Sequence, residues 1–341
     1  MILKYDVYYS ISDNYIEFTQ LIPSKKRWRI RYNNEVKYDI EDFLYKLSSE
    51  GFDNNSLKTI FARNEFIYNI YYFLRQHCLV TNFNSENFKD SPYRRQLEVF
   101  DAWDRENESA LVFQKRLSKS KVLIIGAGGV GTSMANILSS CGVGTIYIAD
   151  YDCIEISNLS RQYLYTPVDI GKLKVDVIAT KINDRKLGKI IPINAKITYK
   201  NIEPIIKNNI EALDIITGLP FTAYASNKLY QKILELNIPL MCVGEHDVGP
   251  LLKSIDDLSS FPNMLYRLFE MQKLYIESRT AKTITGQHPS YLPEISIAAS
   301  ISADEIIRYL SNYAPMRTTK GFYSIDPIKY EVRFYDKRNK K

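Results

Sequence analysis

Hydrophobic and polar positions follow one pattern in the first 85 residues. Apolar or aromatic residues alternate with polar ones in three short segments, which predicts β-strands over 5–12, 15–22 and 27–32. Apolar residues then recur every three or four positions, which predicts helices over 39–51, 55–64 and 65–78. The apolar stretch 79–83 is expected to add a wing strand. We therefore predict a small winged-helix-like α+β domain over residues 1–85.

A different pattern begins at Lys121, where short apolar runs alternate with amphipathic stretches. The runs predict strands over 121–126, 145–150, 190–197, 212–217 and 238–244. The amphipathic stretches predict helices over 132–142, 172–186, 224–237 and 295–311. Such alternation indicates an α/β fold, a Rossmann-like, mostly parallel sheet with helices on both faces. We assign it to residues 86–341, entered through the polar linker 82–92, with helical structure over 251–285 and an edge strand with a basic tail after 329.

Composition adds limits to this picture. Of the 341 residues, 45% are hydrophobic and 25% are charged, as in ordinary globular proteins. The net charge of +6 favours an acidic partner without requiring nucleic acid. None of the four cysteines lies in a C-x-x-C pair, so we expect a reducing compartment and no structural zinc. No apolar run approaches the roughly 20 residues of a membrane span, so we expect a cytosolic (cytoplasmic) protein without a membrane partner.

Candidate chemistry starts at the stretch "IIGAGGVG". Gly126, Gly128 and Gly131 fit G-x-G-x-x-G between a predicted strand and a predicted helix, and Gly129 is an extra glycine within it. Such a loop lets backbone N–H groups approach phosphate oxygens at a helix N-terminus. Asp150 ends the next strand, where a carboxylate can accept hydrogen bonds from ribose hydroxyls. The pattern predicts a nucleotide site, although NAD would use the same groups and a tight turn without a ligand would look alike.

The stretch that follows Asp150 helps to distinguish among the possible ligands of the glycine loop. "GAGGVG", "DYDCIEISNLSRQ" and "DIGKLKVD" occur in that order, with "YRRQ" upstream at 93–96. Together they closely resemble the adenylating domain of the ThiF/MoeB superfamily, the ubiquitin-activating-enzyme-like fold, over roughly residues 90–312. That resemblance implies ATP binding and attack of a carboxylate on the α-phosphate, which gives an acyl-adenylate. An NAD oxidoreductase would leave "SNLSRQ" without a role.

The resemblance also implies roles for single residues. Arg161 and Lys174 are expected to offset the repulsion between a carboxylate and a triphosphate, both of which are anions. Asn158 is expected to bind a phosphate or orient the substrate carboxylate, Asp150 to hold the ribose, and Gln162 to support the phosphate pocket. For each cation, a plain surface charge is the alternative.

Two further positions carry alternatives. Arg95 matches an arginine that members of the family insert into the ATP site of a neighbouring subunit, which implies a homodimer, but Arg94 beside it makes the register ambiguous. Asp152 is either a second nucleotide contact or a turn-forming residue.

This chain also departs from the family pattern in its metal ligands. Many members carry two zinc-binding C-x-x-C pairs, and most have an Mg²⁺-binding Asp after the strand that corresponds to 212–217; neither feature is present in this sequence. Mg²⁺ is expected with ATP, with Asp152, Glu245 or Asp247 as a substitute ligand or with the triphosphate supplying most of its coordination. Its ligands are therefore unassigned.

A second candidate site lies in "VGEHDVGP". Glu245, His246 and Asp247 follow a strand whose carboxyl end should face the nucleotide, so they are candidates for a general base or a substrate contact, with a polar turn as the alternative. His288 has less support for the same pocket. Cys242 is predicted to be a buried small hydrophobe, and Cys153 has no base near it in sequence, so we expect no obligatory thioester.

The first domain suggests what carries the carboxylate. A winged-helix-like module before this fold is similar to MccB-type enzymes of peptide-antibiotic biosynthesis, in which the module clamps the leader of a ribosomally made precursor peptide. Strand addition would hold such a peptide, and the basic hairpin Lys25–Arg31 would suit an acidic leader, with a solvated strand face as the alternative. DNA binding by a winged helix ranks below both, so no nucleic acid partner is expected.

The sequence therefore predicts an ATP- and Mg²⁺-dependent enzyme that adenylates a carboxylate of a precursor peptide and leads to cyclisation within it. By analogy with pantocin A biosynthesis, activation of a glutamate side chain is favoured over MccB-type adenylation of the peptide terminus. MoeB/ThiF-like activation of a ubiquitin-like sulfur carrier is the first rival. A degenerate peptide-binding scaffold without ATP turnover is the non-enzymatic rival.

Overall fold

The computed structural model describes residues 1–22, 25–104, 108–210, 212–219, 227–260, 290–326 and 329–336. The chain forms two compact units, Met1–Lys115 with Ser311–Ala314, and Arg116–Leu310 with Pro315–Lys341. The boundary between domains at residues 85 and 86 stays a prediction from the sequence.

The first unit contains the three strands and three helices expected from its pattern. Its antiparallel sheet has the order β2 (Val7–Ile11), β3 (Tyr15–Gln20), β4 (Lys26–Arg31). The helices are α1 (Lys37–Ser49), α2 (Asn54–Arg63) and α3 (Glu65–Gln76). The expected wing strand is only two residues long, because β5 (Val80–Thr81) pairs with the equally short β1 (Ile2–Leu3).

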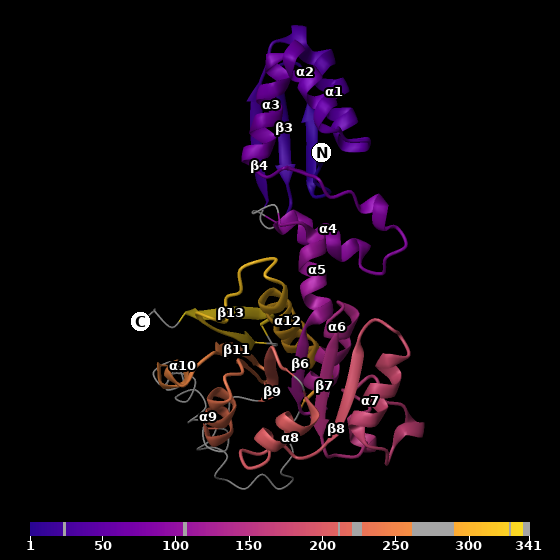
Figure 1. The fold of residues 1–341 in the computed structure, drawn as a ribbon, viewed down its shortest axis with the longest axis vertical. Helices are drawn as coiled ribbons and strands as arrows, with labels where there is room; N and C mark the ends of the chain where they lie inside the picture. Colours follow the sequence, from indigo (N-terminus) through magenta and orange to yellow (C-terminus); the bar gives the residue numbers. More distant parts are fainter. Residues whose placement is uncertain are drawn as a thin grey trace. The chain divides into compact units, whose positions relative to one another are not determined.

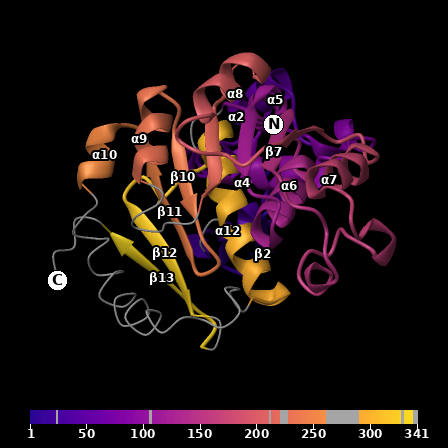
Figure 2. The same cartoon turned by 90° about the horizontal axis from the view of Figure 1, so that it is seen from below.

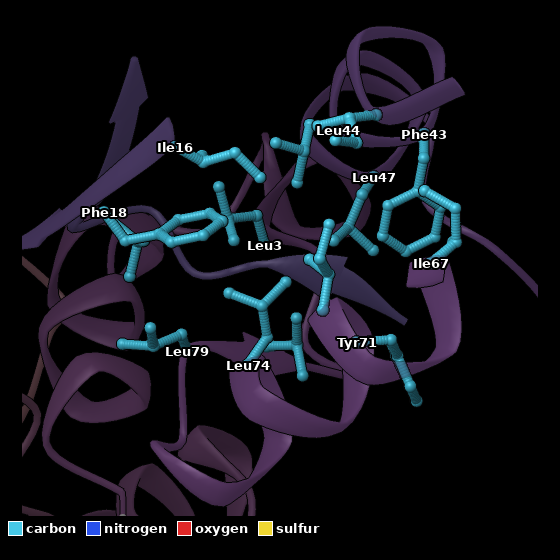
Figure 3. Packing of buried hydrophobic residues seen from close by; sticks show 14 of the residues in the cluster. Leu3, Ile16, Phe18, Phe43, Leu44, Leu47, Ile67, Tyr71, Leu74 and Leu79 are labelled. Carbon is cyan, nitrogen blue, oxygen red and sulfur yellow. The ribbon is translucent and has the colours of Figure 1, made fainter. Parts of the chain in front are cut away.

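The core of this unit follows from the alternation in β3. Ile16 and Phe18 point to one face of the sheet and are fully buried against the helices. Leu44 and Leu47 from α1 and Leu74 from α3 complete the packing, which Figure 3 shows from close by. An apolar cluster of this size explains why the first 80 residues fold as one layer of strands covered by one layer of helices.

Two further helices belong to this part of the chain. They are α4 (Arg94–Trp103) and α5 (Ala110–Lys119). The buried ammonium group of Lys4 donates hydrogen bonds to the backbone oxygens of Asp101 (2.6 Å) and Asp104 (2.9 Å) at the C-terminal end of α4. A cation at the carbonyl end of a helix is favoured by the helix dipole, so this contact ties α4 to β1.

The second unit is built on an eight-stranded sheet (Figure 1). Its order is β13-β12-β11-β10-β9-β6-β7-β8. The parallel half consists of β6 (Lys121–Ile125), β7 (Thr145–Asp150), β8 (Lys189–Asn194), β9 (Ile215–Leu219) and β10 (Leu240–Val243). The antiparallel half consists of β11 (Asp247–Leu252), β12 (Gly321–Asp326) and β13 (Glu331–Asp336). The predicted mostly parallel sheet and its edge strand β13 are confirmed, whereas β11 and β12 were not predicted.

Helices cover both faces of this sheet. On one face, α8 (Ile202–Asn209) and α9 (Asn227–Glu235) pack on residues such as Leu123, Ile216 and Cys242. On the other face lie α6 (Gly129–Ser140) and α12 (Leu292–Ser311), which meet where Gly129 contacts Ile295. Figure 2 shows α9 and α12 on opposite sides of β10 and β11. The crossover from β7 to β8 contains α7 (Lys174–Asn183).

Part of the predicted helical stretch 251–285 is described. It begins with the end of β11 and continues with α10 (Ile255–Ser260), while residues 261–289 lie outside the described residues. The basic tail after residue 336 also lies outside them. No helix among the described residues is long and apolar enough to cross a bilayer.

Candidate functional site

The glycine loop joins β6 to α6 as the sequence predicted. Gly126 has φ of +99°, which glycine adopts without strain, and Gly128 is the N-cap of α6. A Cβ on Gly131 would lie 1.9 Å from the carbonyl oxygen of Gly126, and a Cβ on Gly129 would lie 2.4 Å from Cδ1 of Ile295. A Cβ on Gly128 would meet nothing within 4 Å. The loop is therefore packed tightly behind Gly131 and open in front of Gly128, where the first N–H groups of α6 can meet an anion.

Asp150 holds this loop in place. Its Oδ2 accepts a hydrogen bond from the N–H of Ala127 (2.6 Å), and its Oδ1 accepts one from the N–H of Asp152 (2.9 Å). Each carboxylate oxygen has a second lone pair, which can accept a bond from a hydroxyl group. The predicted ribose carboxylate is thus oriented by two backbone groups before any ligand arrives.

A buried tyrosine, which the sequence analysis did not single out, supports the same loop. The hydroxyl of Tyr165 donates to the carbonyl oxygen of Ala127 (3.2 Å), which also accepts from the hydroxyl of Thr132 (3.0 Å). Burial raises the pKa of Tyr165 well above its usual range, so the hydroxyl stays protonated and remains a donor. The segment after "SNLSRQ" is therefore attached to the glycine loop.

Asp152 and Lys174 lie together at the start of α7. The ammonium nitrogen of Lys174 is 3.0 Å from Oδ2 of Asp152, and the N–H of Lys174 donates to the backbone oxygen of Asp152 (3.0 Å). The lysine side chain is 8% exposed, whereas the aspartate side chain is 47% exposed. The structure thus shows Asp152 as the ion-pair partner of the predicted phosphate cation.

The residues of "SNLSRQ" are close neighbours on one turn. Oδ1 of Asn158 accepts from the N–H of Glu155 (3.1 Å), and a guanidinium nitrogen of Arg161 donates to the carbonyl oxygen of Ser157 (2.7 Å). Gln162 is 2% exposed, and its buried Oε1 has no hydrogen-bond partner among the described residues. Asn158 therefore shapes the turn, while Gln162 keeps an acceptor available for a further donor. The proposed contacts of all three with phosphate remain predictions.

Asp169 organises the rest of this connection. Its carboxylate accepts hydrogen bonds from Thr166 and forms ion pairs with Lys172 (3.1 Å) and Lys181. The ammonium group of Lys181 and the other donors hold the pKa of Asp169 far below its usual range. The spacing of Thr166 and Asp169 is that of a capping box, which could have identified this residue from the sequence. Asp169 is thus a fixed anion between the turn of Arg161 and the helix of Lys174.

A cavity of about 390 Å³ opens beside this carboxylate. It is lined by Asp169, Lys172, Leu173, Asp176, Val177, Thr180 and Lys181. None of these residues belongs to the glycine loop.

The sequence of this chain was compared with profiles of known protein families. The profile of the ThiF family matches residues 93–341. This chain belongs to the ThiF family. The match includes the glycine loop, Asp150 and the whole connection from Asp152 to Lys174, and it confirms the resemblance inferred from the sequence motifs.

Two relatives illustrate which curated proteins this chain is similar to. The chain is 29% identical over 310 residues to the adenylyltransferase and sulfurtransferase UBA4 of Debaryomyces hansenii, with 88% of this chain and 64% of the relative covered. It is 34% identical over 144 residues to the NEDD8-activating enzyme E1 catalytic subunit of Caenorhabditis elegans, covering 41% of this chain and 31% of the relative. The chain thus spans less than two thirds of the length of these relatives.

Solved structures show the same fold over nearly the whole chain. The Escherichia coli MccB structure with AMPCPP and MccA has a TM-score of 0.75 at 19% identity, covering 98% of this chain and 96% of MccB. The PaaA structure has a TM-score of 0.71 at 21% identity, covering 98% and 99%. Coverage of this extent includes both units, so the ThiF-family fold and the preceding small unit are both shared.

The candidate residues 245–247 lie in a hairpin between β10 and β11. The N–H of Gly244 donates to the carbonyl oxygen of Asp247 (2.8 Å), and His246 accepts from the N–H of Ile325 (2.7 Å) through its carbonyl oxygen. Burial raises the pKa of Asp247, whose Oδ1 is buried without a hydrogen-bond partner among the described residues. Among the three residues, Asp247 therefore has a buried carboxylate oxygen that is available as an acceptor. A catalytic or substrate role for them stays a prediction, and His288 lies outside the described residues.

The two neighbouring arginines of α4 differ in their surroundings. Arg94 is ion-paired with Glu86 and lies 3.7 Å from Glu98, and its side chain is 26% exposed. Arg95 forms one contact of 3.1 Å with Glu98, and its side chain is 84% exposed. Of the two, Arg95 has the more exposed side chain, and its place in the ATP site of a neighbouring subunit stays a prediction.

The surroundings of Cys242 and of the candidate metal ligands show which roles they can have. Cys242 is fully buried in β10, and burial raises the pKa of its thiol strongly, as expected for a packing residue. Among the described residues, no group of three His, Cys, Asp or Glu side chains is arranged to hold a metal ion. Asp150 and Asp152 are already engaged with backbone N–H groups and Lys174. The described residues therefore do not fit an Mg²⁺ site made by protein ligands alone, and no chemical step is assigned to one.

Proposed function

We propose that this chain is an ATP-dependent enzyme that adenylates a carboxylate of a ribosomally made precursor peptide. The observation that carries this proposal is the carboxylate of Asp150, which is fixed by Ala127 and Asp152 beside an open glycine loop. A ribose on Asp150 would direct the phosphates of ATP toward the N-terminus of α6.

The reaction has two balanced steps. A substrate carboxylate oxygen attacks the α-phosphorus of ATP, a P–O bond forms, and pyrophosphate leaves with the electron pair of the broken bond. A nitrogen nucleophile within the same peptide then attacks the activated acyl carbon, loses a proton and releases AMP. The net change in the peptide is the loss of one water molecule for each ring formed. A glutamate side chain is the favoured carboxylate, as in the pantocin-type reaction.

Charge compensation is the task proposed for the 152–174 connection. Carboxylate and triphosphate repel each other, and cations near the transferring group lower that barrier. Arg161 is half-exposed and bonded to one backbone oxygen, so its remaining donors can bind phosphate. Lys174 is proposed to exchange its contact with Asp152 for a phosphate oxygen when ATP binds. Gln162 is proposed to support the phosphate pocket from its buried position.

The shared small unit supports a peptide substrate. A UBA4-like or E1-like activity would not by itself require such a unit, whereas the structural match to MccB and PaaA includes it. In our proposal, the leader of the peptide adds to the sheet of the first unit beside its basic strand β4. We further propose a homodimer in which the exposed Arg95 of one subunit completes the ATP site of the other.

A second candidate function is activation of a ubiquitin-like sulfur carrier. The 29% identity with UBA4 over 310 residues favours it, and the same ATP site would serve a carrier with a Gly-Gly tail. A peptide-binding scaffold without ATP turnover is a third candidate, favoured by the ion pair that occupies Lys174.

One experiment separates these candidates. The full chain is incubated with ATP, Mg²⁺ and the peptide encoded by a neighbouring reading frame, and nucleotides and peptide mass are measured. AMP together with the loss of water from the peptide supports cyclisation, while a mass gain equal to AMP supports an MccB-type product. Turnover with a Gly-Gly carrier but not with the peptide would support the sulfur-carrier reaction. If neither substrate yields AMP, the peptide-binding scaffold without ATP turnover is the candidate that remains.

Substitution of Arg161 tests the phosphate site. Arg161→Ala should reduce AMP formation by about 100-fold or more, because it removes a cation from the transferring group. Peptide binding without ATP should be unchanged. Arg63→Ala, which removes an exposed arginine from α2, is the matched control and should leave both measurements as they are. Full activity in Arg161→Ala would refute the assignment.

A further inference from the structure

The carbonyl group of Ala127 in the glycine loop points into the protein. Its oxygen accepts hydrogen bonds from the hydroxyl groups of Tyr165 (3.2 Å) and Thr132 (3.0 Å), and all three residues are buried. The two donors come from different elements, because Thr132 lies near the start of α6 and Tyr165 lies in the connection from β7 to α7. One peptide group of the loop is thus held by two separate segments of the chain.

The orientation of this carbonyl group determines where the next N–H group points. The peptide bond between Ala127 and Gly128 is trans, so its C=O and N–H bonds point in opposite directions. Because the oxygen of Ala127 is turned toward the two hydroxyl groups, the N–H of Gly128 points away from them. The space around Gly128 is open, since a Cβ there would meet nothing within 4 Å. An anion can therefore approach this N–H group.

Glycine at position 128 does not fix this orientation by itself. Gly128 has φ of −73° and ψ of −165°, and a glycine adopts φ values of the opposite sign at little cost because it has no Cβ. Rotation of the peptide group between Ala127 and Gly128 by half a turn would place its carbonyl oxygen where its N–H now points. That oxygen carries a partial negative charge and would repel a phosphate. The glycine that lets a phosphate approach closely thus needs neighbours that hold its peptide group.

We propose that Tyr165 and Thr132 are positioning residues that keep the N–H of Gly128 directed at a phosphate of the nucleotide. Their hydroxyl groups favour the inward carbonyl, because rotation of the peptide group would leave two buried donors without this acceptor. The N–H of Ala127, which donates to Asp150 (2.6 Å), belongs to the preceding peptide group. The ribose carboxylate and the two hydroxyl groups therefore orient consecutive peptide groups. The inference rests on the proposed function only in taking ATP as the ligand.

Removal of the hydroxyl groups, singly and together, tests the positioning in the full chain. Tyr165→Phe and Thr132→Val each delete one donor and keep the shape of the side chain. Each should raise the dissociation constant of a non-hydrolysable ATP analogue about fivefold, because one of the two hydrogen bonds remains. The doubly substituted chain should lose at least about 50-fold, more than the product of the single losses, because neither hydroxyl group then opposes rotation of the peptide group. Thr132→Ser keeps the hydroxyl group and should bind the analogue within about twofold of the native chain.

Adenosine separates a lost phosphate contact from general damage to the loop. It has the base and ribose of ATP but no phosphate, so its inhibition constant, measured by competition with a fluorescent ATP analogue, should stay within about twofold in every folded variant. Tyr163→Phe is the matched control and should change neither ligand, because Tyr163 is exposed and its hydroxyl group contacts Asn136 (3.0 Å).

Two results would overturn the proposal. One is equal weakening of adenosine and the ATP analogue, which would mean that the hydroxyl groups support the loop as a whole. The other is native affinity for the ATP analogue in the doubly substituted chain. If thermal melts show that the doubly substituted chain does not fold, the contrast between Thr132→Val and Thr132→Ser decides the question, and equal affinities in these two variants would refute the positioning.

Binding of the nucleotide is measured apart from catalysis. If the variants show the expected losses and no substrate yields AMP, the proposed function fails and the positioning stands. If a precursor peptide is adenylated and all variants bind the ATP analogue as the native chain does, the proposed function stands and the inference fails. A native chain that does not bind the ATP analogue would overturn both.

Discussion

The parallel and antiparallel halves of the large sheet each contain a tightly packed glycine, but only one of these glycines lies beside the candidate nucleotide site. Each half contains a glycine whose Cβ would lie 1.9 Å from a backbone oxygen, Gly131 against Gly126 in the parallel half and Gly321 against Tyr335 in the antiparallel half. Gly131 lies in the first turn of α6, next to the carboxyl end of β6, where ligands of α/β sheets bind, whereas Gly321 begins a strand near the sheet edge. Close packing alone therefore does not mark a functional glycine; its place in the topology does.

Two buried carboxylates of this unit, Asp169 and Glu305, also differ in their place in the topology. Asp169 is surrounded by Thr166 and two lysines on the connection that carries the proposed phosphate-binding residues. Glu305 of α12 accepts instead from the N–H groups of Arg317 (2.9 Å) and Thr318 (2.9 Å) and from the Thr318 hydroxyl (2.8 Å). Those donors belong to the turn before β12, so Glu305 fixes the antiparallel half without facing the nucleotide loop.

The largest effect is expected from the two glycines. Gly131→Ala should remove detectable ATP binding, because the new methyl group must push the glycine loop away from α6 at a cost of about 3 kcal/mol. Gly321→Ala should lower the free energy of unfolding by a similar amount, seen as a lower melting temperature, while leaving the ATP dissociation constant within about twofold. Calorimetric titration with a non-hydrolysable ATP analogue and thermal melts measure both quantities.

Two results with these variants would contradict the difference between the two halves of the sheet. If Gly321→Ala weakens ATP as strongly as Gly131→Ala, the antiparallel half contributes to the site. If Gly131→Ala binds ATP normally, the glycine loop is only a tight turn.

An intermediate effect is expected from acid titration of Asp169 and Asp247. The pKa of Asp169 is depressed, so its ionised form stabilises the fold above the unfolded value near 4, and this contribution is lost as the pH falls through the folded value. Asp169→Asn should therefore lower the melting temperature by roughly 5 °C at pH 7, with a difference from the native chain that shrinks below about pH 4.

Substitution of Asp247 should change the melting temperature in the opposite direction from substitution of Asp169. Burial raises its pKa, so its ionised form is disfavoured in the folded state, and the penalty grows as the pH rises past about 4. Asp247→Asn should leave the melting temperature unchanged or raise it by a few degrees at pH 7, and the difference should vanish in acid. If Asp247 is also a proton acceptor, kcat falls in this variant without a change in ATP affinity. Parallel pH profiles for the two variants would show that at least one of the two carboxylates is not in the environment described.

Sequence patterns predicted the parallel half of the sheet better than the antiparallel half. Buried parallel strands such as 121–125 and 145–150 are continuous apolar runs between glycines and helices, and this signal is strong. β11 is interrupted by Gly249 and Pro250, and β12 reads "GFYSID", so neither offers a run or a clean alternation. The family motifs could place Asp150 and Lys174 on the same connection because the topology of a βαβ unit fixes where its strands end.

Contacts within the candidate site were harder to foresee. The ion pair of Lys174 with Asp152 joins residues 22 positions apart, and Tyr165 reaches Ala127 across 38 positions. Such pairings depend on the path of a loop, which no periodicity encodes. The capping-box spacing of Thr166 and Asp169 and the nearby Lys172 were visible in the sequence, whereas Lys181, 12 positions from Asp169, becomes its ion-pair partner only after folding.

The smallest effect is expected from the two cysteines nearest the proposed chemistry. Cys242 is in the parallel half, fully buried, and its raised pKa keeps the thiol protonated, so it is a poor nucleophile. Cys242→Ala should cost about 1 kcal/mol of stability through lost packing and leave AMP formation unchanged. Cys153 is exposed and bridges to Leu173 through its backbone, so Cys153→Ser keeps the local pairing and should retain activity within about twofold. A thioester intermediate on either residue would instead appear as a trapped covalent adduct and a loss of turnover in the matching variant. Activity in the doubly substituted chain would show that neither Cys153 nor Cys242 forms an obligatory thioester, as direct attack within one peptide requires.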